Sequence, residues 1–286
     1  MVYKQKRTFL EWCIKKIRKI FNLDGKKGKT RINLVSSFPL YKPYSAGTYK
    51  DRSALTLLAI NELIPVLSSF TKSLGYKSTE TIHLNSLLEP EQSKSANELK
   101  AIFDKHHSDK GAEYNSYHLL YSMILADRSA IKNVFEIGLG TNNTDVVSNM
   151  GKEGSPGASL RAFREFLPHA EIFGADVDKR VLFEDERIRT FHVDQTDDKT
   201  FDLLNQQLPN HFDLMIDDGL HAPNANVRAL NFFLSHIKVG GWAVIEDIGE
   251  PAIPVWELIG SILPAEFESA IYRTEKAILF AVKRVN

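Results

Sequence analysis

A regular alternation of short apolar runs with helical segments occupies the chain from Asn133 onward and constrains the fold more than any other feature. The apolar runs are NVFEIGL, EIFGADV, IRTFHVD, FDLMIDD and GWAVIED. Helical segments are expected between them, around residues 159–166, 199–207 and 224–237. Strand, helix and strand repeated in this way predict a parallel sheet that helices cover on both faces.

The end of the chain departs from this alternation. FESAIYR and AILFAVK are separated only by TEK, which is too short for a parallel crossover and predicts an antiparallel hairpin. The predicted fold class is therefore α/β: a Rossmann-like, seven-stranded, mostly parallel sheet with a C-terminal antiparallel hairpin, plus a mainly helical N-terminal region. We assign residues 1–100 to an auxiliary or oligomerisation region and residues 101–286 to the α/β domain.

The charge of the chain is unevenly placed. Its net charge is zero, but the first 31 residues contain eleven Lys or Arg against Glu11 and Asp24, a balance of +9 that leaves −9 for the remainder. The body therefore has no basic surplus with which to bind nucleic acid. Cys13 is the single cysteine, which favours a reducing compartment, so we expect a cytoplasmic protein. No segment is expected to reach the length of a membrane span.

Residues 8–21 form a basic amphipathic pattern with an apolar face that includes Phe9, Trp12 and Phe21. Such a helix either lies on an anionic membrane or docks on protein. Packing on its own domain or on another subunit is the favoured interpretation, and a homo-oligomer is expected.

Two of the apolar runs end in carboxylates. FDLMIDDGLH places Asp217 and Asp218 at a strand end with His221 three residues on, and GWAVIED ends at Glu246 and Asp247. Ligands of open α/β sheets bind at the carboxyl ends of strands, where these groups suit a divalent cation with a general base beside it. We assign Asp218 and Asp247 to the metal, with Asp217 or Glu246 as a candidate further ligand, and His221 to the base. Capping of the next turn is the alternative role for Asp217 and Asp218.

The first strand leads into a glycine motif, EIGLGT. Gly138 and Gly140 let the backbone turn tightly under a ligand, but Asn143 occupies the position of the third glycine of a dinucleotide fingerprint. Glu136, inside the motif, suits a positively charged amino acid moiety better than a pyrophosphate. This combination favours S-adenosylmethionine over NAD.

The next strand ends also carry polar groups. Asp176 is placed to bind the hydroxyls of a ribose, and Asp194 with Gln195 to meet an adenine edge. For each acidic residue, capping remains the alternative. We also assign Asp217 to the cofactor site, together with Ser108 of SDKG, which is expected at a helix N-terminus with free backbone donors.

Taken together, the segments SDKG, EIGLG, GASLRAFREFLPHAEIFGADVD, VDQTD, IDDGLH and VGGWAVIEDI resemble those of the class I S-adenosylmethionine-dependent methyltransferases. Within that class they are most similar to the metal-dependent macrolide sugar O-methyltransferases of the mycinamicin and macrocin type. The resemblance covers residues 108–284. It implies Mg²⁺-dependent, or other divalent-cation-dependent, methyl transfer to a hydroxyl, with the IDDGLH histidine as base, strand-end aspartates as ligands and SDKG closing over the cofactor.

The resemblance leaves the acceptor undefined. The loop TNNTDVVSNMGKEGSPG is longer than usual, and the resemblance does not extend over the first hundred residues. The expected acceptor is a small hydroxylated molecule, such as a sugar of a glycoside, capsule precursor or secondary metabolite. The alternatives are a nicotinamide-dependent oxidoreductase, which the missing third glycine and the final hairpin disfavour, and an idle scaffold that binds a partner. An idle scaffold need not keep Asp218, His221 and Asp247 together.

Overall fold

The computed structural model describes residues 49–86 and 90–286. The chain divides into two compact units, Met1–Ser73 and Leu74–Asn286. The described part of the first unit is helix α3 (Tyr49–Ser73), which contains Pro65. Its segment Ala54–Ser73 is long and apolar enough to cross a membrane by length and composition, so the prediction that no segment reaches that length was wrong. The basic helix predicted over residues 8–21 lies outside the described residues.

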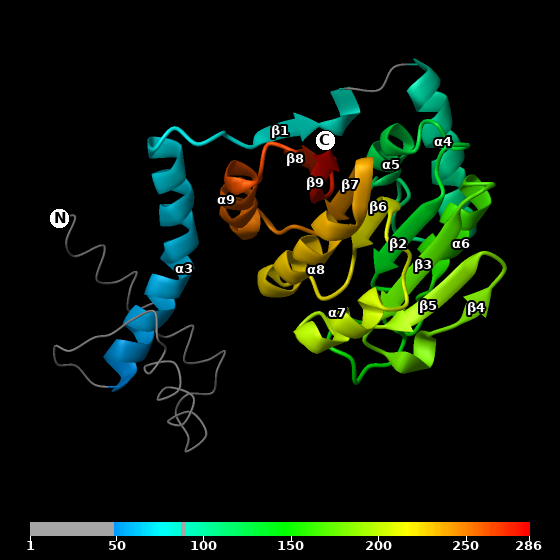
Figure 1. Cartoon of the computed structure of the whole chain (residues 1–286). Helices are drawn as coiled ribbons and strands as arrows, with labels where there is room; N and C mark the ends of the chain where they lie inside the picture. The colour runs from blue at the N-terminus through cyan, green and yellow to red at the C-terminus, as the bar shows by residue number, and fades with distance from the viewer. Residues whose placement is uncertain (1–48, 87–89) are drawn as a thin grey trace. The chain divides into compact units, whose positions relative to one another are not determined.

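The second unit is built on a nine-stranded sheet with the order β1-β8-β9-β7-β6-β2-β3-β5-β4 (Figure 1). The strands are β1 (Glu80–His83), β2 (Asn133–Ile137), β3 (Glu171–Asp176), β4 (Glu184–Asp185), β5 (Ile188–His192), β6 (Phe212–Asp217), β7 (Ile237–Ile245), β8 (Phe267–Arg273) and β9 (Ile278–Arg284). The five apolar runs form the neighbouring parallel strands β5, β3, β2, β6 and β7. The predicted hairpin is β8–β9, with β9 antiparallel to both β8 and β7.

The predicted fold class is confirmed, with two short additions at the edges of the sheet. β1 pairs with β8 in parallel, and β4 pairs with β5 in antiparallel orientation. Both are short, with four and two residues, so neither contributes an apolar run of the length that marks the inner strands.

Helices cover both faces of the sheet. One face carries α4 (Pro90–Lys105), α5 (His118–Ile124) and α6 (Ala158–Phe166), and the other carries α7 (Asp198–Asn205), α8 (Pro223–His236) and α9 (Ile253–Ile262). Short 3-10 turns occupy Leu84–Ser86, Lys179–Val181 and Glu250–Ala252. Neighbouring residues of β2 enter different cores: Val134 packs with the first group of helices and Phe135 with the second. Burial on both faces explains why the inner strands read as unbroken apolar runs.

The boundary between the two units lies earlier than the sequence predicted. The compact unit begins at Leu74, whereas the predicted α/β domain began at residue 101. The reason is that β1 belongs to the central sheet and α4 packs against α5 and α6. An oligomerisation role for the first unit stays a prediction.

The sheet places three strand ends side by side. Ile137 of β2 is in register with Asp217 of β6, which in turn is in register with Ile245 of β7. The chain continues from β2 to β3 on one side, while β6 lies on the other, so the strand order reverses at β2. Crevices at such points, outside the carboxyl ends of the strands, are the usual ligand sites of open α/β sheets.

Candidate active site

A pocket of about 550 Å³ lies at the carboxyl ends of the central strands. Nine of the eleven site residues predicted from the sequence line it. They are Ser108, Gly138, Gly140, Asp176, Asp194, Gln195, Asp218, His221 and Asp247. The two that do not line it are Glu136 and Asp217, both fully buried.

Gly138 forms part of the pocket floor, and its backbone has a conformation that only glycine adopts easily. Its φ is +96°, and a Cβ at this position would collide with the backbone carbonyl oxygen of Asp218. Gly140 also has a positive φ, of +77°, and packs against Met150 of the long loop. The glycine motif therefore allows β2, the end of β6 and the loop to approach one another closely.

Carboxylates at the end of β3 bind the loop that follows β2 through hydrogen bonds. The Asp176 carboxylate accepts hydrogen bonds from the backbone N–H groups of Leu139 (2.8 Å) and Asp178 (2.8 Å), and burial raises the pKa of Asp176. The Asp178 carboxylate accepts from Thr141 Oγ1 (2.7 Å) and Asn143 Nδ2 (2.7 Å). Asp178 was not predicted as a site residue, and it fixes the beginning of the loop to the pocket wall.

Ser108 and Asp194 line the pocket while they stabilise local turns. Asp194 Oδ1 accepts from the backbone N–H (2.8 Å) and Oγ1 (2.7 Å) of Thr196, which is the capping alternative considered for this residue. Ser108 Oγ accepts from the backbone N–H of Lys110 (3.4 Å). The helix predicted to begin at Ser108 is wrong, because the segment forms turns and α5 begins only at His118.

Asp217 is a structural residue rather than part of the pocket surface. Its carboxylate accepts hydrogen bonds from Gln195 Nε2 (2.7 Å) and Asn226 Nδ2 (2.8 Å), and burial raises its pKa. Gln195 Oε1 accepts in addition from the backbone N–H of Leu220 (2.8 Å). The assignment of Asp217 to cofactor binding was therefore wrong, since its side chain points into the protein and ties β6 to α8.

Lys110 is the centre of a buried ionic cluster that the sequence did not indicate. Its ammonium lies 3.0 Å from Glu136 Oε1, 2.6 Å from Asp218 Oδ2 and 2.5 Å from Glu246 Oε2, and the lysine is fully buried. Tyr121 of α5 donates a hydrogen bond to the other oxygen of Glu246. Glu136 thus meets the ammonium of this chain's own lysine, which overturns its predicted contact with a cofactor.

The cluster carries more negative than positive charge. Burial opposes the charged form of Lys110, but Asp218, Glu136 and Glu246 outweigh it and hold the pKa of the ammonium well above its usual value. Burial raises the pKa of Glu246 to about 8 and raises that of Asp218 well above its usual value, although Lys110 acts in the opposite direction on both. One ammonium against three carboxylates leaves room for further positive charge, in the form of protons or a cation at the edge of the cluster.

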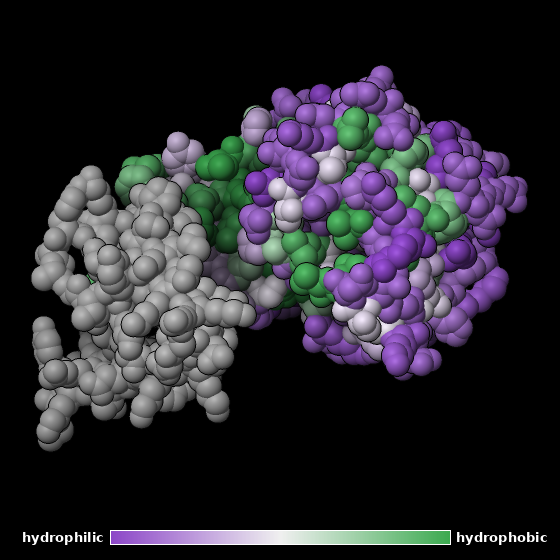
Figure 2. All heavy atoms as spheres, turned by 90° about the horizontal axis from the view of Figure 1, so that it is seen from below, coloured by the Kyte–Doolittle hydropathy of each residue, from purple (hydrophilic) through white to green (hydrophobic). Residues whose placement is uncertain are grey.

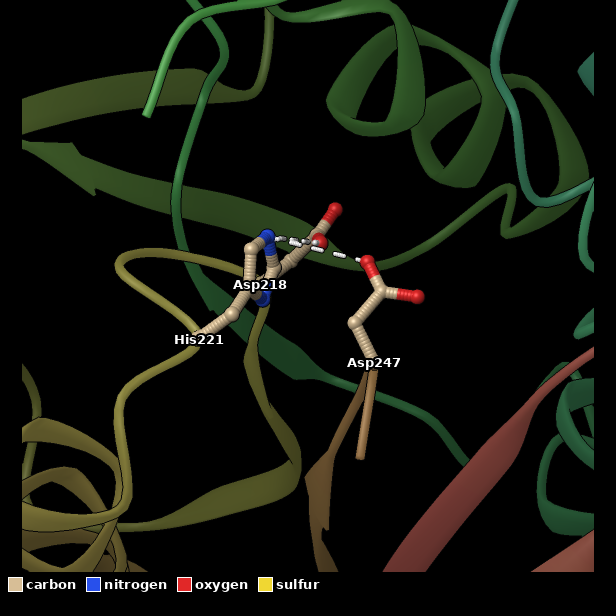
Figure 3. A group of neighbouring side chains, drawn as sticks. All are labelled: Asp218, His221 and Asp247. Carbon is tan, nitrogen blue, oxygen red and sulfur yellow. Dashed lines mark ion pairs between the residues drawn. The ribbon is translucent and has the colours of Figure 1, made fainter. Parts of the chain in front are cut away.

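Asp218, His221 and Asp247 converge at the mouth of this cluster (Figure 3). His221 Nε2 lies 3.8 Å from Asp218 Oδ1 and 3.6 Å from Asp247 Oδ2, and all three side chains are partly exposed. His221 and Asp247 have positive φ angles of 54° and 53°. Such backbone conformations are costly for residues other than glycine and cluster at functional sites.

Each of the two aspartates uses one oxygen inside the protein and presents the other to the pocket. Asp218 Oδ2 contacts Lys110, and Asp247 Oδ1 accepts a hydrogen bond of 2.5 Å from the Tyr117 hydroxyl. That hydroxyl in turn accepts from the backbone N–H of Asp247 (3.1 Å). The oxygens left over, Asp218 Oδ1 and Asp247 Oδ2, are the ones that face His221. Internal partners of this kind fix the orientation of metal-binding carboxylates.

Of the two groups of acidic or imidazole ligands that the described residues bring together, only one fits a metal ion. Asp218, His221 and Asp247 offer ligand atoms within 4.8 Å of one another, with two free carboxylate oxygens at the pocket. Oxygen ligands of this type suit Mg²⁺. The ligand atoms of Glu136, Asp218 and Glu246 are equally close, but the Lys110 ammonium occupies their centre.

The comparisons with known proteins point to the same class of enzyme as the motifs. Mycinamicin VI 2''-O-methyltransferase of Micromonospora griseorubida is 38% identical over 93 residues, which are 32% of this chain and 23% of that protein. A tetracenomycin-C 3'-O-methyltransferase of Streptomyces olivaceus that acts on a 2-methoxy-rhamnosyl derivative is 32% identical over 155 residues, 53% of this chain and 37% of that protein. The chain thus spans well under half the length of these curated relatives. No known protein-family model matches it.

Solved structures confirm the fold. The MycE methyltransferase of the mycinamycin biosynthetic pathway, in complex with Mg and SAH, superposes with a TM-score of 0.51 at 23% identity, over 66% of this chain and 55% of that one. The fold is that of the class I methyltransferases. The resemblance to macrolide-type sugar O-methyltransferases, which the motifs indicated, is confirmed by the sequence relatives.

The cluster around Lys110 predicts a pH-dependent loss of stability when the ammonium is removed. In Lys110→Met, three carboxylates stay buried without their cation, which is expected to lower the free energy of unfolding by roughly 3–5 kcal/mol at about pH 8. The loss should be smaller at about pH 5, because carboxyls whose pKa is raised in the folded state take up protons there and no longer need the cation. Chemical denaturation at both pH values measures this.

Lys100→Met is the matched control for this experiment. Lys100 forms an exposed ion pair with Asp104 (2.7 Å), so the same substitution should change the free energy of unfolding by less than about 1 kcal/mol at either pH. Equal losses in the two variants, or a loss in Lys110→Met that grows toward low pH, would contradict the assignment of Lys110 as the counter-ion of the cluster.

Proposed function

We propose that the chain is a metal-dependent O-methyltransferase that moves a methyl group from S-adenosylmethionine to a hydroxyl of a small molecule, in the first place a sugar hydroxyl of a glycoside. The observation that carries the proposal is the convergence of Asp218 Oδ1, Asp247 Oδ2 and His221 Nε2 at the edge of the pocket. The relatives named above are O-methyltransferases, and a related MycE structure is described with Mg, SAH and mycinamycin VI. They support the same reaction class.

The pocket over β2, β3 and β5 is the proposed cofactor site. Gly138 and Gly140 keep this floor free of side chains, and Asp176 and Asp194 line its wall with carboxylate oxygens that retain unused lone pairs. Ser108 lines the same pocket from the segment before α5. S-adenosylmethionine supplies the methyl group as an electrophilic sulfonium when it is bound.

The free oxygens of Asp218 and Asp247 are the proposed metal ligands. Lys110 and Tyr117 hold the other oxygen of each carboxylate, so neither side chain has to reorganise in order to bind a cation. A divalent cation at this position would lower the pKa of an acceptor hydroxyl and so help it to lose its proton.

His221 is the proposed general base. Its Nε2 faces the two free carboxylate oxygens, so it lies next to any hydroxyl that those groups position. The carboxylates stabilise the imidazolium that forms when the ring takes up the hydroxyl proton. General-base assistance of this kind contributes about 10²- to 10⁴-fold to the rate.

The loop between β2 and α6 is the proposed cover of the reacting groups. Ser148 Oγ donates a hydrogen bond to the Gly219 carbonyl (3.1 Å), which holds the loop over the end of β6, while Val147 at its tip is 89% exposed. Exclusion of water favours a transfer in which charge on oxygen and sulfur is neutralised. We assign acceptor selection to this loop.

The expected homo-oligomeric state, the cytoplasmic location and the absence of nucleic-acid binding stay predictions from the sequence.

The cofactor assignment predicts that Gly138→Ala loses affinity for S-adenosylhomocysteine. The new methyl group would meet the Asp218 carbonyl and displace the pocket floor, so calorimetry should show at least a tenfold weaker binding constant, about 1.4 kcal/mol. Gly240→Ala is the control, because Gly240 also has a positive φ (+83°) but has no atom within 4 Å of its Cβ position. Tighter binding of NAD than of S-adenosylhomocysteine by the unmodified protein would show that the reaction class is wrong.

The division of labour between His221 and Asp247 predicts two different defects. His221→Ala should lose about 10²- to 10⁴-fold in turnover while it still binds Mn²⁺ or Mg²⁺ and S-adenosylhomocysteine, since its role is proton removal. Asp247→Asn should weaken binding of the cation itself, and a chelator should stop the unmodified enzyme until Mg²⁺ is restored. Calorimetric titration of the cation and a methyl-transfer assay separate the two.

His169→Ala, at an exposed histidine outside the pocket, is the control and should keep full turnover. Full activity in excess chelator, with His221→Ala inactive, would leave the histidine as base and reassign Asp218 and Asp247 to hydrogen bonding of the acceptor.

A further inference from the structure

In helix α3 polar side chains are buried and apolar side chains are exposed, the opposite of the usual pattern for a helix of a water-soluble protein. Among residues 54–73, whose side chains the structure describes, the two buried ones are the polar Thr56 and Ser68. Large apolar side chains are exposed along the helix, with Val66 60% and Phe70 55% accessible. The other exposed apolar side chains of α3 are Leu55, Leu58, Ile60, Leu63 and Leu67. A surface of this kind needs an apolar environment.

The exposed apolar side chains form a continuous stripe. Leu63, Leu67 and Phe70 follow one another at intervals of four and three residues, the spacing that places side chains on one side of a helix. Polar residues lie along a different line of the helix, at intervals of seven and four residues. They are Asn61, Ser68 and Lys72, with Glu62 and Ser69 beside them.

The second unit offers no comparable stripe among its described residues. Its exposed large apolar side chains are distributed over separate elements, such as Leu203 in α7 (59% exposed) and Val239 in β7 (58%). The face of this unit seen in Figure 2 is mainly hydrophilic, with separated hydrophobic patches. The row of exposed apolar side chains is therefore a specific property of α3 and is not shared by the described surface of the second unit.

Charge and length together point to a lipid surface. The segment Ala54–Ser73 has 20 residues, which corresponds to roughly 30 Å of helix. The first 31 residues of the chain add nine net positive charges to the same unit. Basic segments are attracted to anionic lipid headgroups, and stable membrane attachment takes two such signals, one apolar and one electrostatic. Glu62, near the middle of the helix, disfavours a crossing of the hydrocarbon core and favours a helix that lies in the interface.

We propose that α3 docks on an anionic lipid bilayer, with the stripe Leu63, Leu67 and Phe70 and the neighbouring Val66 in the lipid phase. The basic segment of residues 1–31 supplies the attraction to the headgroups. This proposal goes beyond the methyl-transfer reaction and does not depend on it: it concerns the first unit, whereas the proposed active site lies in the second.

Flotation of the full-length protein with lipid vesicles tests the proposal. The protein is expected to float with vesicles of phosphatidylcholine and phosphatidylglycerol, and much less with phosphatidylcholine alone or in high salt. Val66→Asn combined with Phe70→Asn should reduce the partition coefficient at least about tenfold, because two large side chains lose their apolar environment. Neutralising Lys15, Lys16, Arg18 and Lys19 to Gln should remove the preference for anionic vesicles.

Leu203→Asn combined with Val239→Asn is the matched control. It replaces two equally exposed apolar side chains in the second unit and should leave flotation unchanged, and binding of S-adenosylhomocysteine should be unchanged in every variant, which shows that each is folded. Failure of the unmodified protein to float with anionic vesicles would overturn the proposal. So would a Val66→Asn/Phe70→Asn variant that floats normally but falls from an oligomer to a monomer, because a second copy of the chain would then cover the stripe.

Discussion

The contact on which the site depends is the buried ammonium of Lys110 among three carboxylates from three different strands. Glu136 lies in β2, whereas Asp218 and Glu246 directly follow β6 and β7. The lysine itself comes from the turn segment that precedes α5. Removal of the lysine would leave three buried carboxylates facing one another without their cation. The contact therefore fixes the relative positions of three strand ends and closes one side of the pocket with the segment before α5.

The cluster also explains how ordinary aspartates become a preorganised site. Lys110 takes one oxygen of Asp218 and Tyr117 takes one oxygen of Asp247, so the remaining oxygens face His221 in a fixed arrangement. A carboxylate whose second oxygen is held does not rotate away when a ligand leaves. The excess of negative charge behind these oxygens would strengthen the binding of the proposed cation beyond what the two aspartates alone would provide.

The sequence predicted the parts of the fold and site that follow from local pattern. Unbroken apolar runs identified the five parallel strands because both faces of each are buried, and the short TEK connection identified the hairpin. Strand ends identified Asp218, His221 and Asp247, which the structure brings together. Glu136 and Asp217 were misassigned because the position of a carboxylate at a strand end does not reveal which way its side chain points.

The site residues that the sequence did not reveal contact residues that are far away in the sequence. Lys110 is more than a hundred residues from Asp218 and Glu246, and only folding shows that SDKG supplies a counter-ion and not a helix N-terminus. Tyr117 and Tyr121 are four residues apart and contact the adjacent Asp247 and Glu246. Nothing in the sequence alone marked these tyrosines as partners of β7. The short edge strands β1 and β4 were likewise set by pairing and not by periodicity.

Anomalous diffraction from crystals soaked in Mn²⁺ tests whether Lys110 is the permanent internal cation and leaves Asp218 and Asp247 to hold an exchangeable one. We expect one manganese peak within bonding distance of Asp218 Oδ1 and Asp247 Oδ2, with the Lys110 ammonium unmoved among Glu136, Asp218 and Glu246. A peak at the centre of those three carboxylates with Lys110 displaced, or no peak at either position at saturating Mn²⁺, would contradict it.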